Sequence, residues 1–176
     1  MSYDSKQDTL NHINEVALRL YNVMELLHER ASLHDQSKLG PEEKPHFDAV
    51  TDKLKGLTYG SDEYREALKT IAPALKHHYA NNSHHPEHYT DGIEGMDLID
   101  LVEMYCDWAA AVTRHADGNL AKSIAHNEIR FVMSSQLAMI FQNTHARFGG
   151  FCGSLEGDPR FEPGVNRPMT LNGKLA

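Results

Sequence analysis

The chain has 176 residues, 40% of them hydrophobic, so it can bury one domain-sized core. Seventeen Lys and Arg against 25 Asp and Glu give a formal charge of −8, which argues against a broad basic surface for duplex nucleic acid. No apolar run approaches the roughly 20 residues of a membrane-spanning helix, the first residues lack a signal-peptide pattern, and there are only two cysteines. These features predict a cytoplasmic protein without membrane contact.

The first predicted element is a long amphipathic helix over residues 8–31, because apolar side chains recur there at alternating steps of three and four. The chain then meets Gly40-Pro41, which would end or redirect a helix. Residues 34–38 are therefore expected at a helix edge. A shorter helix is predicted over 42–57.

A third helical segment is predicted from Asp62, where apolar positions again step by three and four up to His78. This register places His78 on the inward face, while His77 points about 100° away. Pro73 is expected to kink or restart the helix. Residues 81–92 are rich in Asn, His and Pro, which predicts a loop.

Two further long helices complete the predicted set. The helix that follows Gly95 has a polar face in an otherwise apolar segment, formed by Asp100, Glu103, Asp107 and Arg114. Another helix is predicted over 119–148, with a polar stripe of Ser123, Asn127, Arg130 and Ser134. The fold class is therefore all-α. We expect a helical domain over residues 1–148 and an irregular, Gly- and Pro-rich C-terminal tail over 149–176.

Histidine is the residue that departs most from average usage. There are twelve, and five of them lie between His77 and His88. Imidazole and carboxylate are preferred ligands of divalent metals, and several predicted elements deliver them. The candidate metal ligands are His34, Asp35, His78, His84, His85 and Asp107.

Each of these residues also has a structural interpretation. His78 could be a buried histidine that bonds a backbone carbonyl, His84 and His85 could be a solvated loop pair, and Asp107 could lie on an exposed stripe. Only one of His84 and His85 need bind a metal. A bound metal would lower the pKa of a water molecule, and Lys38, one turn beyond Asp35, would neutralise phosphate oxygens. Arg130 is a second candidate for phosphate contact.

Three segments carry a resemblance to the HD-domain superfamily of metal-dependent phosphohydrolases, which is named for an adjacent His-Asp pair. The resemblance covers residues from about 10 to 130, with order and approximate spacing in agreement. Within the superfamily, the chain is most similar to a group of small, uncharacterised proteins carried by bacteria and phages. The matching segments are His34-Asp35-Gln36-Ser37-Lys38, residues 84–92 (HHPEHYTDG) and residues 104–110 (MYCDWAA).

The resemblance implies a bundle of at least five helices around one or two divalent ions, with Mn, Mg, Fe, Co, Ni and Zn as candidates. It also implies an upstream histidine ligand, for which His12 is better placed than His28. Residues 93–95 lack the Tyr-Pro ending of the cyclic-dinucleotide branch, and Ala110 replaces its second aspartate. Cyclic-dinucleotide specificity is therefore not carried over.

The leading hypothesis is a metal-dependent phosphohydrolase that acts on a nucleotide or another phosphate ester, with Asp35, Lys38 and Arg130 as catalytic candidates. One alternative is a dinuclear iron oxygenase built on the same ligands. Another is a non-catalytic, metal-stabilised module that binds a nucleotide or a protein. The Gly-rich tail is compatible with contacts in a homo-oligomer.

Overall fold

The computed structural model describes residues 3–58, 60–114 and 118–148. The described residues fall into two compact units, which divide between Leu33 and His34. The C-terminal tail predicted over 149–176 lies outside the described residues.

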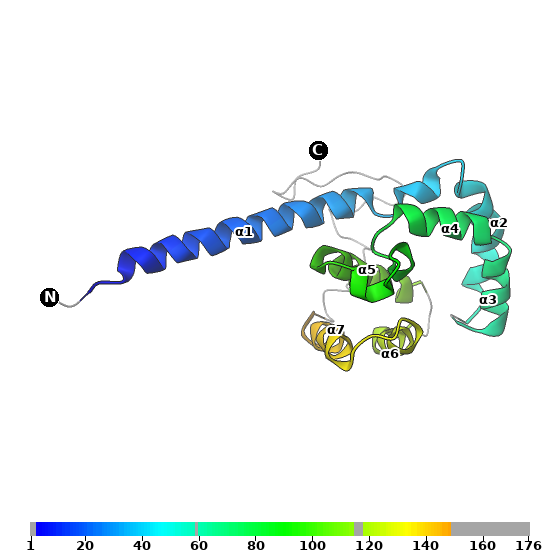
Figure 1. Cartoon of the computed structure of the whole chain (residues 1–176). Coiled ribbons are helices and arrows are strands. Elements are labelled where there is room, and N and C mark those ends of the chain that lie inside the picture. Colours follow the sequence, from blue (N-terminus) through cyan, green and yellow to red (C-terminus); the bar gives the residue numbers. More distant parts are fainter. Residues whose placement is uncertain (1–2, 59, 115–117, 149–176) are drawn as a thin grey trace. The chain divides into compact units, whose positions relative to one another are not determined.

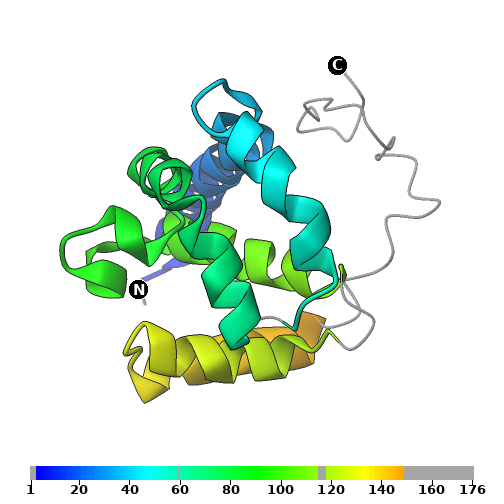
Figure 2. The ribbon, with the colours of Figure 1, turned by 90° about the vertical axis from the view of Figure 1, so that its right-hand side faces the viewer.

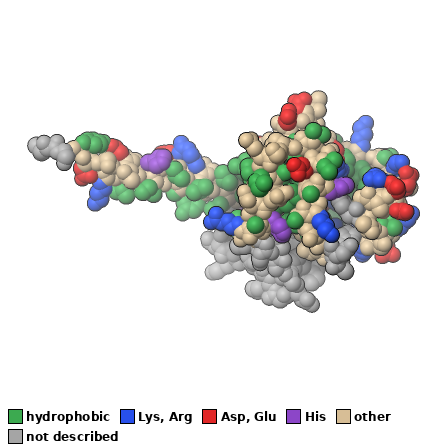
Figure 3. Space-filling model, turned by 90° about the horizontal axis from the view of Figure 1, so that it is seen from below, with side chains coloured by type: hydrophobic (Ala, Val, Ile, Leu, Met, Phe, Trp, Pro, Cys, Tyr) green, Lys and Arg blue, Asp and Glu red, His purple; other side chains and the backbone are tan. Residues whose placement is uncertain are grey.

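The first unit is formed by helix α1 (Lys6–Leu33), which confirms the predicted first helix and extends it at both ends. None of its residues is buried, and apolar side chains are exposed along its length (Figure 3). The exposed apolar side chains include Leu10, Ile13, Leu20 and Met24. The predicted apolar stripe is therefore present on the helix.

The second unit contains six α-helices and three short 3-10 helices among the described residues, and no strand, so the fold is all-α (Figure 1). The α-helices are α2 (Lys44–Lys55), α3 (Asp62–Lys69), α4 (Ala72–Asn81), α5 (Leu98–Val112), α6 (Leu120–Arg130) and α7 (Ser135–Phe148). The 3-10 helices are η1 (Gln36–Leu39), η2 (Pro86–His88) and η3 (Gly92–Gly95).

The apolar core of this unit lies among α5, α6 and α7. Helix α5 packs against α6, and α6 packs against α7 (Figure 2). Trp108 on α5 stacks parallel to Phe131, with ring centroids 6.2 Å apart, and meets Phe141 of α7 edge-on. Met104 and Ile124 are completely enclosed. This core buries one side of α5.

The segment that contains Pro73 restarts as a new helix, one of the two outcomes expected for it. Helix α3 begins at the N-cap Ser61, whose hydroxyl accepts from the backbone N–H of Tyr64. Pro73 lies in the first turn of α4, where its missing N–H costs nothing. Because α4 is a separate helix, its own register decides which of its side chains face inward, and His78 is one of those that are buried.

The single helix predicted over 119–148 is wrong, because the chain breaks between α6 and α7. Val132 adopts a left-handed φ of 52°. The backbone N–H of Met133 bonds the carbonyl of Glu128, and that of Val132 bonds the carbonyl of Ile129, which together form a Schellman end. The Ser134 hydroxyl then caps α7 by accepting from the N–H of Leu137. This turn contains no glycine or proline, so its sequence carries no breaker signal.

Across the described residues, no helix combines the length and apolarity that a bilayer span requires.

Candidate metal centre

The adjacent pair His34-Asp35 opens the second unit. Asp35 adopts a left-handed φ of 57° immediately before η1, a conformation that aspartate tolerates better than most residues. The 3-10 turn brings Lys38 back, so that its Nζ donates to Asp35 Oδ2 at 2.5 Å. The pair therefore stands at a sharp turn and not inside a helix.

The other histidines come from α4 and the loop after it. His78 lies in the last turn of α4 and is 1% exposed, and His84, in the loop, is equally buried. Asp100 holds this loop against α5, since its carboxylate accepts from the hydroxyls of Ser83 at 2.7 Å and Tyr89 at 2.6 Å. The loop predicted as irregular is thus fixed at both ends.

Helix α5 turns three of the four residues of its predicted polar face inward, whereas the fourth, Arg114, is exposed and lies beyond the end of the helix. Asp100 and Glu103 are buried, and Asp107 is partly buried. An apolar helix that buries one acidic face requires positive partners for it. Histidines are the partners of Glu103 and Asp107, whereas Asp100 accepts from the hydroxyls of Ser83 and Tyr89.

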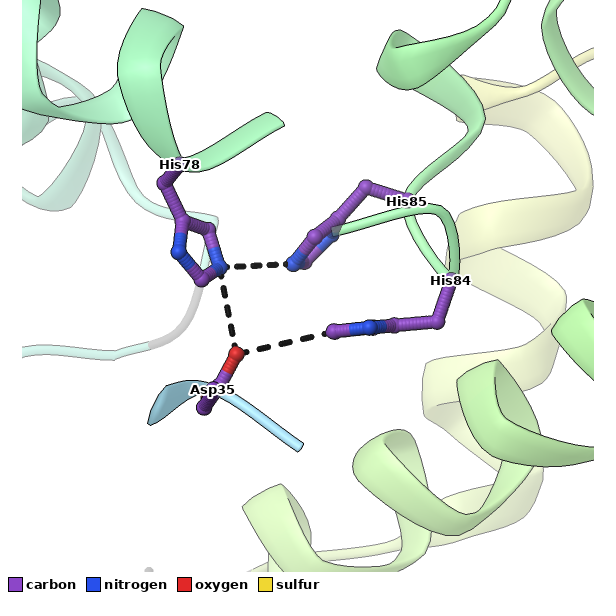
Figure 4. Close-up of side chains that lie close together, drawn as sticks. All are labelled: Asp35, His78, His84 and His85. Atoms are coloured by element: carbon purple, nitrogen blue, oxygen red, sulfur yellow. Dashed lines mark hydrogen bonds and ion pairs between the residues drawn. The ribbon is translucent and has the colours of Figure 1, made fainter. Parts of the chain in front are cut away.

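Three imidazole rings converge on Asp35 (Figure 4). His78 Nε2 lies 3.2 Å from Asp35 Oδ1, and His84 Nε2 lies 3.7 Å from the same oxygen. His85 Nε2 lies 3.0 Å from His78 Nε2. One potential ligand atom from each of these four residues lies within 4.8 Å of the others, so a single ion could contact them all.

A second potential ligand group forms on the other side of Asp35. His34 Nε2 lies 3.5 Å from Asp35 Oδ2 and 3.7 Å from Asp107 Oδ1. One potential ligand atom from each of His34, Asp35 and Asp107 also lies within 4.8 Å of the other two. Asp35 belongs to both groups, with Oδ1 nearest to His78 and His84 and Oδ2 nearest to His34, so the residues of each group could hold a divalent ion.

The group of Asp35, His78, His84 and His85 contains two buried atoms without a hydrogen-bond partner among the described residues. They are Asp35 Oδ1 and His84 Nε2. Buried polar atoms are rarely left unsatisfied, because the desolvation cost is not recovered. Both atoms are lone-pair donors and both belong to the convergent set. A divalent cation would satisfy them together, so these residues fit the expected metal.

The opposite ring nitrogens are held by two buried glutamates. His34 Nδ1 lies 2.8 Å and His84 Nδ1 3.1 Å from Glu103 Oε1, and His78 Nδ1 lies 2.9 Å from Glu43 Oε2. An ionised carboxylate only accepts hydrogen bonds, so each Nδ1 carries the proton that it donates. The Nε2 atoms of the three rings face the centre, so they are the nitrogens that a bound metal would contact.

The charges of the cluster favour a cation. Burial opposes ionisation of Asp35, but the neighbouring His78 ring, the hydrogen bond from Lys38 and the nearby positive charges hold its pKa well below the usual range. Burial also opposes ionisation of Glu103, yet hydrogen bonds from His34 and His84 lower its pKa to about 2. Burial together with the charges of His84 and His78 lowers the pKa of His85 to about 3, so this ring is neutral near pH 7.

The pKa of His34 reflects the negative charge around it. Burial lowers this pKa, but hydrogen bonds to Asp107 and Glu103 and the charge of Asp35 outweigh that effect and raise it to about 10. The metal-free protein therefore holds a proton among these carboxylates at neutral pH, at the position where an ion would bind.

The two predicted phosphate contacts have different surroundings. Lys38 lies beside Asp35, with its Nζ 5.4 Å from the centre of the Phe47 ring. Arg130 pairs with Glu87 at 2.5 Å and lies over the ring of Phe131. It lines a shallow, open pocket of about 270 Å³, together with residues 86–87, 89–90, 92–93 and 131–132. Its phosphate contact stays a prediction.

The predicted upstream ligand His12 lies on α1, in the other unit, where it is exposed. Its alternative, His28, is half-buried on the same helix. The structure thus brings together six of the seven predicted metal ligands, and the role of His12 stays a prediction. The six are His34, Asp35, His78, His84, His85 and Asp107.

The sequence analysis did not select Glu43 as a site residue. It placed Glu103 on the polar face of its helix without giving it a role. Spacing could have found Glu103, which lies one turn before Asp107. Glu43 has no comparable signal, because it follows another glutamate and only the fold reveals that it is 0% exposed. Ser37 and Asn82 also contact His78 Nδ1, at 3.2 and 3.1 Å.

The comparisons with known proteins give a family without an activity. No curated protein and no solved structure matches the chain. The model of a family of unknown function, DUF5662, matches residues 1–147, which is most of the chain and includes every residue of the centre. The chain therefore belongs to the DUF5662 family.

Proposed function

We propose that this protein is a metal-dependent phosphohydrolase that acts on a nucleotide or a related phosphate ester. The observation that carries the proposal is the convergence of histidine ring nitrogens on Asp35, whose buried Oδ1 has no hydrogen-bond partner among the described residues. The resemblance to HD-type phosphohydrolases and the convergence of the segments that carry it support the same function.

In this proposal, two groups of residues hold the metal. Asp35, His78, His84 and His85 form one group, and His34, Asp35 and Asp107 form the other. A divalent ion bound there would supply hydroxide at neutral pH by lowering the pKa of a coordinated water molecule. Asp35 faces both positions through separate oxygens, so it would orient the two groups relative to each other.

Lys38 supplies the positive charge that a phosphate substrate requires. Its Nζ lies at the edge of the cluster, where it donates to Asp35 and lies near the ring of Phe47. In the proposed reaction, the ammonium group neutralises a phosphate oxygen as charge builds up on it. Arg130 would have to leave Glu87 to take a similar part.

The remaining parts of the proposal concern the setting of the protein. We place it in the cytoplasm, with a small nucleotide as its partner and no role for duplex nucleic acid. Its net charge of −8 supports a small, metal-assisted substrate in preference to a long polyanion. A homo-oligomer and an origin in a phage remain compatible with this function.

The first test is metal content, measured by mass spectrometry on protein purified without an affinity tag. We expect stoichiometric Mn, Fe, Co, Ni or Zn in the wild type, and its loss in Asp35→Ala and Asp107→Ala. Glu66→Ala removes an exposed carboxylate on α3 and serves as the matched control, with metal content unchanged. A wild type that binds no metal after reconstitution would contradict the proposal.

The second test is release of phosphate from a panel of nucleotides by the metal-loaded protein. We expect turnover by the wild type and by Glu66→Ala, and none by Asp35→Ala that keeps its helical circular dichroism. Bound iron with an oxidation-state-dependent absorption band, and no hydrolysis, would favour the oxygenase instead. Tight nucleotide binding without turnover would favour the non-catalytic module.

A further inference from the structure

Two buried glutamates stand behind the histidines of the centre, and their contacts differ. Glu43 uses one oxygen for each of two neighbouring rings on α4, with Oε1 2.7 Å from His77 Nδ1 and Oε2 2.9 Å from His78 Nδ1. Glu103 uses a single oxygen, Oε1, for His34 and His84, which come from different elements.

The two rings bonded by Glu103 belong to different ligand groups. Around Asp35, His34 groups with Asp107, whereas His84 groups with His78 and His85. The two histidines also form a third group with Glu103 itself, which they face through Nδ1. Glu103 therefore touches one histidine of each group. Of the two rings bonded by Glu43, only His78 belongs to a ligand group that includes Asp35.

We propose that Glu103 is a positioning residue for both metal positions, whereas Glu43 positions a ligand of only one. The proposal rests on the metal centre of the proposed function. Each glutamate holds a proton on Nδ1 and thereby turns the Nε2 lone pair toward the ion. Loss of Glu103 frees one candidate ligand on each side of Asp35. Loss of Glu43 affects a single candidate ligand, His78, together with His77, which belongs to neither group.

The test variants either keep or remove the glutamate oxygen that accepts from the histidine Nδ1 atoms. Glu103→Gln keeps a carbonyl oxygen that can accept from both rings, so it should retain both ions. Glu103→Leu removes the acceptor and should weaken both positions about 10- to 100-fold, the usual effect of losing a carboxylate behind a metal-bound histidine. Glu43→Leu should weaken one position by a similar factor and leave the other unchanged.

The experiment titrates the metal-free full-length protein with Mn²⁺, and follows bound metal by equilibrium dialysis and the electronic state by electron paramagnetic resonance. Two neighbouring Mn²⁺ ions in the wild type should give a spin-coupled spectrum. Glu43→Leu should give the six-line spectrum of a single bound ion, and Glu103→Leu should bind neither ion at the same concentration. Glu66→Leu, on the exposed face of α3, is the control and should match the wild type.

Two results would overturn the proposal. One is a Glu103→Leu variant that binds both ions with wild-type affinity, and the other is a Glu43→Leu variant that loses both ions together. Should Glu103→Leu fail to fold, Glu103→Asp keeps the buried charge but is one methylene too short to reach both rings, and it should weaken both positions.

Different results would contradict the positioning role of Glu103 and the phosphohydrolase function. A wild type that binds two ions but hydrolyses no nucleotide overturns the phosphohydrolase, and the difference between the two glutamates still stands. A hydrolase whose Glu103→Leu variant keeps both ions overturns the inference alone. A wild type that binds no Mn²⁺ overturns both.

Discussion

Helix α5 has two buried sides that are stabilised by opposite means. One side contributes Met104, Trp108 and Ala109 to the apolar core with α6 and α7. The other side contributes Glu103 and Asp107 to the histidine cluster. The apolar side is stabilised by removal from water alone, whereas the acidic side remains a cost until cations or protons neutralise it. Stability and metal binding should therefore be separable on this helix.

The largest effect on stability is expected from the apolar side. Phe141→Ala removes a ring that is 5% exposed and packs against Trp108 and Tyr105, so it should lower the free energy of unfolding by about 3–5 kcal/mol. Urea unfolding of the metal-free protein measures this loss. Ile140→Ala, at an exposed position next to it on α7, should change the free energy by less than about 0.5 kcal/mol. Equal losses in the two variants would contradict the assigned core.

The acidic side should contribute most to stability when metal is present. At a free metal concentration about 100-fold above Kd, binding stabilises the fold by about 2.7 kcal/mol, which Asp35→Asn should abolish. The shift of the thermal midpoint between chelator and excess Mn²⁺ measures this difference. Asp52→Asn, an exposed site on α2, should keep the full shift. A metal-dependent shift that persists in Asp35→Asn would show that the ion binds elsewhere.

The pH dependence of the metal-free protein should follow His34. Burial lowers its pKa, but Asp107, Glu103 and Asp35 raise it from 6.5 to about 10. The proton therefore stabilises the fold fully below the ordinary pKa, and this contribution is lost as the pH rises toward the folded value. Solvent screens the partly exposed ring, so the effect should be smaller than that of metal.

This prediction is checked by urea midpoints in chelator at about pH 6 and about pH 9, chosen to lie within the range over which the His34 proton is lost. The wild type should become less stable at the higher pH. His34→Gln removes the titrating ring and should flatten the difference. An equal fall in both proteins would assign the pH dependence to other groups.

The smallest effect is expected at the break between α6 and α7, where Val132 is 87% exposed and has a left-handed φ. Val132→Gly removes a β-branched side chain from a conformation that favours glycine, so it should stabilise the protein by about 1 kcal/mol. Thermal unfolding measures the gain. Ile129→Gly, at a similarly exposed position inside α6, should destabilise by a comparable amount. Stabilisation by both substitutions would contradict the backbone argument.

Most of the fold follows from apolar spacing, but one break does not. The register up to His78 and the acidic face of α5 were predictable, because helical periodicity fixes which side chains share a face. The turn at Val132 was not, since its strain is met by backbone bonds that spacing does not reveal. Long-range partnerships were equally hidden, and Glu43 acquires its role only when α4 packs beside the turn that precedes α2.

The backbone at Asp35 restricts how the centre could be re-engineered. Its left-handed φ suits Gly, Asn and Asp, so glutamate, the usual choice for a longer carboxylate ligand, would strain the chain as well as overshoot the cluster. Asp107 lies in regular α-helix and carries no such restriction. A designer who wishes to change the metal preference of the proposed centre should therefore vary position 107 and leave position 35 as it is.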